Sequence, residues 1–80
     1  METITAETKL TQKSYSFVDT HYGYRQEYNL YVDGIKTNIV SIVIGSKNPP
    51  SNERTFLVGN GEYKTAKQAF EADGYEYKRE

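Results

Sequence analysis

Residues 28–44 read YNLYVDGIKTNIVSIVI, and this segment decides the fold. Asp33 and Gly34 separate two runs of β-branched and aromatic residues, and Asp-Gly favours a type I′ hairpin turn, which needs positive φ at both central residues. The turn predicts four opposed pairs: Val32 with Ile35, Leu30 with Thr37, and Tyr28 with Ile39 on one face, and Tyr31 with Lys36 on the other. Residues 39–44 are apolar on both faces, which predicts the central and most buried strand.

Alternating apolar and polar residues extend the sheet on both sides of this hairpin. Residues 22–32 alternate with one aromatic face, residues 14–17 alternate as well, and residues 55–58 return to strand character. Residues 45–53 are polar and contain Pro49-Pro50, so we expect a connecting loop there. Residues 4–10 also alternate, and residues 1–12 are either an edge strand or a flexible arm. Residues 75–78 predict a short last strand.

One segment has the signals of a helix. Thr65 to Gln68 fits a capping box, in which the threonine hydroxyl and the glutamine side chain satisfy free backbone groups. Phe70 lies on a narrow apolar stripe, and Gly74 supplies a left-handed residue to close the helix. The sequence therefore predicts an α+β fold: an antiparallel β-meander of four to five strands with one short C-terminal helix, about residues 65–73, packed on or beside the sheet. We expect one small domain over residues 1–80, with Phe70 as its main anchor.

The charge and composition of the chain exclude several classes of protein. Ten basic and eleven acidic residues are interspersed and give a formal net charge of −1, which disfavours binding to duplex nucleic acid through phosphate neutralisation. The absence of cysteine excludes disulfides and thiolate metal sites and favours a cytoplasmic setting. The first residues lack the features of a signal peptide, and the longest apolar run is too short to cross a bilayer. We expect no membrane partner.

The sequence predicts no catalytic, metal-binding or cofactor-binding residue. His21 is the only histidine, and no serine lies in a nucleophile-elbow sequence. The chain has no pair of histidine or cysteine residues, and its acidic residues lack calcium-loop spacing. It also has too few residues of the catalytic types to preorganise a site. We therefore expect a protein that is not an enzyme.

Eight tyrosines and a proline-containing loop are the features that suggest binding. Tyr22, Tyr24 and Tyr28 share the side of Leu30 and Val32, so we expect them in or beside the core. Tyr31 points to the other side and is the best candidate for an exposed recognition aromatic, unless the helix covers that face. The candidate interaction surface combines this face with the loop and comprises Arg25, Tyr31, Lys36, Lys47, Asn48, Pro49, Pro50, Ser51 and Asn52.

Two functions fit these features. The first is a small non-enzymatic protein-interaction module, such as an inhibitor or regulatory adaptor, that binds a macromolecular partner through its surface. The alternative is a single-stranded nucleic-acid-binding protein, in which exposed tyrosines stack on bases and scattered basic residues contact phosphates: Arg25, Lys36, Lys47, Arg54 and Lys64. The near-neutral charge favours a protein partner. A homodimer formed through a strand edge is a further alternative.

Overall fold

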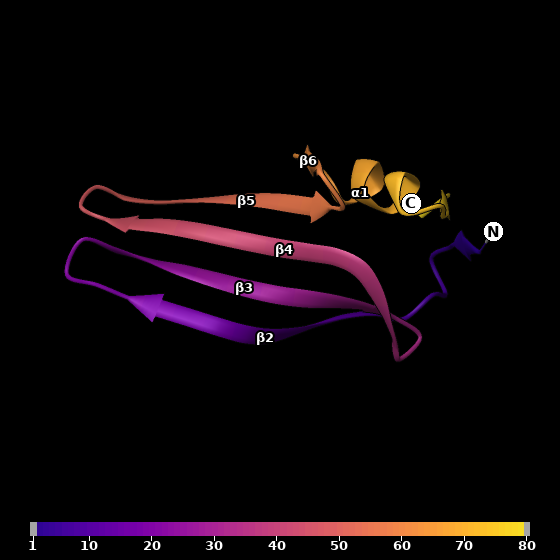
Figure 1. The fold of residues 1–80 in the computed structure, drawn as a ribbon, viewed down its shortest axis with the longest axis horizontal. Helices are drawn as coiled ribbons and strands as arrows, with labels where there is room; N and C mark the ends of the chain where they lie inside the picture. The colour runs from indigo at the N-terminus through magenta and orange to yellow at the C-terminus, as the bar shows by residue number, and fades with distance from the viewer. Residues whose placement is uncertain (1, 80) are drawn as a thin grey trace.

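A computed structural model describes residues 2–79 and contains a five-stranded antiparallel sheet with the strand order β2-β3-β4-β5-β6 (Figure 1). The strands are β2 (Leu10–Asp19), β3 (Gly23–Val32), β4 (Ile35–Lys47), β5 (Pro50–Val58) and β6 (Gly61–Tyr63). A short helix, α1 (Ala66–Ala72), follows the sheet. Two further short strands, β1 (Thr3–Ile4) and β7 (Glu76–Tyr77), pair in parallel beside the helix. The predicted α+β meander with one C-terminal helix is confirmed.

The β3–β4 hairpin forms at the predicted turn. Asp33 and Gly34 have φ angles of 48° and 84°, and Val32 opposes Ile35 as expected. The predicted register fails farther along, because the pairing shifts between Asn29 and Tyr31. Tyr28 consequently opposes Ser41 rather than Ile39.

The shift in pairing comes from a bulge in β4 that keeps the two faces of the strand unchanged. Between the pairs Tyr31–Lys36 and Asn29–Val40, β4 has three residues and β3 has only Leu30. The two additional residues preserve the alternation of faces, so Thr37 and Ile39 both remain buried on the side of Leu30. The Thr37 hydroxyl donates a 2.9 Å hydrogen bond to the Leu30 carbonyl.

The loop expected over residues 45–53 is not present. β4 continues to Lys47 and β5 begins at Pro50, so only Asn48 and Pro49, joined by a cis peptide bond, make the turn. Ile44 opposes Glu53 and Ser46 opposes Ser51 in a regular antiparallel ladder. Polar residues suit these strand positions because this part of the sheet lies away from the core.

The first residues of the chain also differ from expectation. The alternating segment 4–10 is not one strand: Thr3 and Ile4 form β1, Thr5 to Thr8 make a turn, and Leu10 already belongs to β2. Ile4 is completely buried in β1, outside the main sheet, whereas residues 10–12 belong to β2, an edge strand of that sheet and thus one of the two alternatives expected. Later in the chain, β6 was not expected from the sequence.

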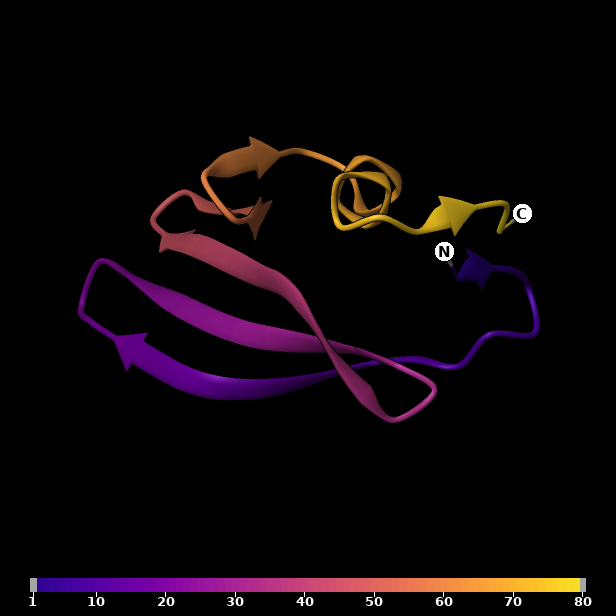
Figure 2. The same ribbon diagram turned by 45° about the vertical axis from the view of Figure 1, so that its right-hand side comes forward.

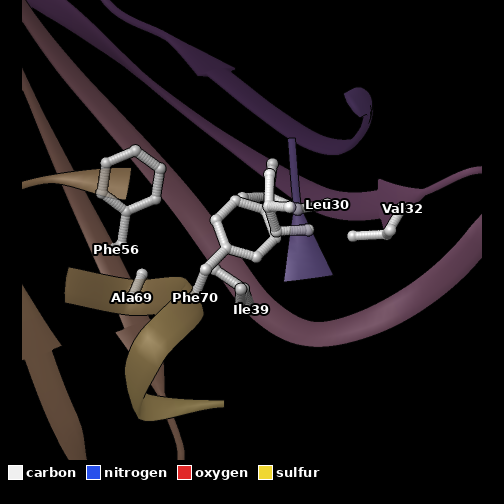
Figure 3. Close-up of a cluster of buried hydrophobic side chains, with 7 residues drawn as sticks. Leu30, Val32, Ile39, Phe56, Ala69 and Phe70 are labelled. Atoms are coloured by element: carbon white, nitrogen blue, oxygen red, sulfur yellow. The ribbon is translucent and has the colours of Figure 1, made fainter. Parts of the chain in front are cut away.

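The helix begins and ends as predicted. The Thr65 side chain accepts a 3.2 Å hydrogen bond from the Gln68 backbone N–H, and Gly74 has a φ of 92°. Phe70 is 2% exposed and anchors the helix to one face of the sheet (Figure 3). The buried cluster around it comprises Ile4, Leu30, Val32, Ile39, Phe56 and Ala69.

We predict that Phe70→Ala lowers the free energy of unfolding by about 3–5 kcal/mol, because it empties the centre of the only cluster of this size in the described residues. Urea unfolding followed by circular dichroism measures the change. Phe17→Ala is the matched control: Phe17 is 57% exposed, and its loss should change stability by less than about 0.5 kcal/mol. If Phe70→Ala does not fold, Phe70→Leu should show a smaller loss in the same direction; equal effects at positions 70 and 17 would contradict this view of the core.

Candidate interaction surfaces

The sheet extends well beyond the core that stabilises it. The molecule measures 43 × 25 × 20 Å, and α1, β1 and β7 gather at one end, while the β2–β3 and β4–β5 turns lie at the other (Figures 1 and 2). We call residues 17–24 and 45–53 the projecting end. Side chains on both faces of the sheet there lie away from the helix.

Polar contacts join the two turns of the projecting end. The Lys47 ammonium lies 2.7 Å from an Asp19 carboxylate oxygen, and the Lys47 backbone N–H donates to the Tyr22 carbonyl. The Thr20 hydroxyl accepts a hydrogen bond from the Gly23 N–H and closes the first turn. These contacts fix the two turns relative to each other.

Exposed aromatic rings concentrate at this end. Tyr22 is 83% exposed, and His21 packs edge-on against its ring at a centroid distance of 5.2 Å. Phe17 packs against Tyr24 at 6.3 Å. Tyr22 was expected in or beside the core, and that expectation is wrong: it lies in the turn between β2 and β3, outside both strands, and lines a hollow with Val18 and Arg25.

Tyr24 lies across the backbone of its cross-strand neighbour Gly45, where a Cβ atom would collide with the ring. Because Gly45 has no side chain, the Tyr24 ring has room to lie flat on the sheet. This contact positions Tyr24 for its packing with Phe17.

We predict that Gly45→Ala destabilises the protein by about 1–3 kcal/mol, because the added methyl group displaces the Tyr24 ring. In a Tyr24→Ala background the same substitution should stabilise by up to about 1 kcal/mol, since alanine loses less backbone entropy than glycine in a strand. Urea unfolding of the four proteins gives the double-mutant cycle. An equal effect of Gly45→Ala in both backgrounds would show that the ring does not depend on this glycine.

The second candidate surface is the sheet face opposite α1, which we call the open face. Its central residues come from β4, namely Val40, Ile42 and Ile44; Ile44 is 55% exposed, whereas Ile42 is only 7% exposed. Two hollows lie on this face and share Arg25 and Ile44. One is lined by Val18, Tyr22 and Gly23 towards the projecting end, and the other by Ile42, Thr55, Leu57 and Glu62.

Charged groups flank the apolar centre of the open face. The Arg25 guanidinium lies 3.3 Å from the Glu27 carboxylate, which also accepts a 2.6 Å hydrogen bond from the Tyr15 hydroxyl. This hydrogen bond raises the pKa of Tyr15, because it stabilises the protonated phenol. On the other side, Lys64 lies 3.3 Å from Glu53 and 3.8 Å from Glu62.

The structure does not bring the residues of the predicted surface into one site. Arg25 and Tyr31 both lie on the open face but are separated by six residues of β3, or about 20 Å. Tyr31 is half-buried, and the Lys13 ammonium lies 4.8 Å from its ring centre. Lys36 is its cross-strand neighbour. The remaining predicted residues, 47–52, are exposed at the turn of the projecting end.

Several exposed residues were missed by sequence reasoning. Phe17 and Val18 are adjacent, so one ring or branched side chain faces each side of the sheet, and both are more than half exposed. Tyrosine is a residue type common at binding surfaces, but Tyr22 was placed in or beside the core from the sequence.

Within residues 2–79, no group of three or more His, Cys, Asp or Glu side chains could hold a metal ion. The helix in this range is too short and too polar to cross a membrane. Comparison with family models, curated proteins and solved structures finds no match to the chain.

Proposed function

We propose that this chain is a small non-enzymatic protein-interaction module, an inhibitor or regulatory adaptor of the cytoplasm, that binds a macromolecular partner through its projecting end. The observation that carries the proposal is the 83% exposure of Tyr22 on a turn that hydrogen bonds and an ion pair hold in place. Tyrosine is enriched among the residues that dominate binding energy at protein interfaces.

The architecture of the projecting end supports this role. Its two turns are short and tied together, so little conformational freedom is lost when a partner binds. Phe17 on β2 adds a second exposed ring, and the β4–β5 turn contributes the exposed polar residues Asn48, Ser51 and Asn52. An apolar centre with a polar surround is the usual composition of a protein interface.

A protein partner is favoured over single-stranded nucleic acid. Of the basic residues that would contact phosphates, Arg25, Lys47 and Lys64 each form an ion pair with a carboxylate. Arg25 lies on the open face, whereas Arg54 lies on the opposite face against Tyr28. A nucleic-acid groove needs basic groups that follow one continuous path.

We predict that a Phe17→Ala/Tyr22→Ala variant loses at least about 30-fold in affinity for its partner, since truncation of interface hot spots costs about 2 kcal/mol or more. Affinity capture from host lysate after nuclease treatment identifies the partner, and calorimetry with the purified partner measures the loss. Ile35→Ala is the control, because Ile35 is 66% exposed but lies at the β3–β4 turn, at the other end of β4.

The capture experiment also separates the two functions. A stoichiometric protein that survives nuclease treatment and is lost with the double variant supports the proposal. Retention of that protein by the double variant would contradict the assigned surface, and recovery of nuclease-sensitive material alone would favour nucleic-acid binding.

A further inference from the structure

The open face carries a charge pattern that is organised by strand register. One row across the sheet reads Val18, Arg25, Ile44 and Glu53 on β2, β3, β4 and β5. Another row reads Lys13, Asn29, Val40, Leu57 and Glu62 on β2 to β6. In both rows a cation stands on the β2–β3 side, an apolar residue stands on central β4, and an anion stands on the β5–β6 side. The row between them carries Glu27 on β3, and Lys64 lies beside Glu53 and Glu62, so each flank also holds one opposite charge and keeps a net excess of one positive charge on the β2–β3 side and one negative charge on the β5–β6 side.

Such a face is complementary to itself. A two-fold axis that runs along β4, midway between two facing sheets, places β4 on β4 and exchanges the two flanks. Arg25 then faces Glu53 of the second copy, and Lys13 faces Glu62 of the second copy. A two-fold axis across the strands would instead set each flank against the same flank, with like charges near each other.

We propose that the open face is the interface of a homodimer, in which two copies pack their sheets face to face about a two-fold axis along β4. The β4 side chains Val40 and Ile44 form the centre of this interface on either side of Ile42, which is only 7% exposed in the single chain, and the hollows beside Arg25 and Leu57 receive side chains of the second copy. The arrangement is that of a β-sandwich, with sheets about 10 Å apart.

The charged groups are free to exchange partners. The Arg25–Glu27 and Lys64–Glu53 pairs within one chain lie at the surface, where ion pairs contribute little to stability. Association removes water from these groups and adds an opposite charge from the second copy. The pairs between copies therefore set the register of the dimer more than its strength.

The size of the face limits the affinity. Five strands spaced by about 4.8 Å and seven residues of β4, which rise about 23 Å, give roughly 1,000 Å² counted over both copies. This area lies at the lower limit for a specific interface. We therefore expect a dimer that dissociates on dilution.

Association through the β2 edge, one form of the strand-edge alternative left open by the sequence, fits the structure less well. β2 is one edge of the main sheet, and its register shifts between Ser14 and Ser16. A bulge at Tyr15 interrupts the straight row of backbone groups that another strand would need. The open face has no such interruption along β4 between Val40 and Ile44.

Sedimentation equilibrium from about 10 µM to about 1 mM tests the dimer, a range that suits an interface of this size. The wild-type chain should change from monomer to dimer over this range. Ile44→Lys should be monomeric throughout, and Ile35→Lys, which changes an exposed isoleucine at the β3–β4 turn, should behave as wild type. A wild-type chain that remains monomeric, or an Ile44→Lys chain that dimerises equally well, would overturn the inference.

Charge reversal tests the register of the two copies. Arg25→Glu and Glu53→Arg should each weaken self-association by at least about tenfold, because like charges then face each other across the interface. An equimolar mixture of the two variants should form a heterodimer, since positions 25 and 53 then carry opposite charges at both symmetry-related contacts. Failure of the mixture to associate would overturn the proposed axis.

Tyr22 lines the same hollow as Arg25 and Ile44, so two other variants separate this inference from the function proposed for the projecting end. Leu57→Lys changes the open face outside that hollow, so it should be monomeric and should still bind the partner protein. Phe17→Ala changes the opposite face of β2, so it should still dimerise. Loss of dimerisation by Phe17→Ala would place the self-association surface at the projecting end and overturn this inference.

Discussion

The packing of Phe70 between the helix and one end of the sheet is the interaction on which the rest of the structure depends. α1 is only seven residues long, and a helix of this length is not stable in water without tertiary contacts. Phe70 provides them by reaching Leu30, Ile39 and Phe56, and Tyr75 and Tyr77 pack on its ring from the other side. The buried apolar cluster of this chain thus lies at one end of the sheet.

The other end of the sheet is held by different forces. There the ladder of backbone hydrogen bonds continues without a buried cluster, and cross-strand contacts take the place of a core. Tyr24 over Gly45, the Lys47–Asp19 ion pair and the stacking of Arg54 on Tyr28 are examples. Each is individually weak, but each acts on strands whose register is already fixed by the core-bearing half.

Local chemistry made much of the fold predictable. The turn at Asp33–Gly34, the helix cap at Thr65 and the left-handed Gly74 depend on one or two residues each, and all are found where expected. The bulge opposite Leu30 was not predictable, because a regular ladder and the bulged ladder both place Thr37 and Ile39 on the side of Leu30 and therefore give the same alternating pattern. Backbone pairing beyond a turn depends on distant packing, which a local pattern does not contain.

The candidate surfaces were only partly predictable for a related reason. Alternation assigned Arg25 and Tyr31 to the same face, but it carries no information about how far the helix extends over the other face. Tyr22 was placed in the core because it shares the parity of Leu30, although it lies too far from the helix to be covered. Polar residues and Pro50 were read as a loop, whereas a strand that is open to water on both sides accepts them.

The parallel pairing of β1 with β7 joins segments that are far apart in the sequence. The Glu76 N–H donates to the Glu2 carbonyl and the Lys78 N–H to the Ile4 carbonyl, so contacts separated by more than seventy residues complete the core. During synthesis on the ribosome, the β2–β3 and β3–β4 hairpins can pair early, but Ile4 has no strand partner until Tyr77 has left the exit tunnel. The core therefore closes only after β7 has been translated, and the nascent sheet depends on its polar faces to remain dissolved until then.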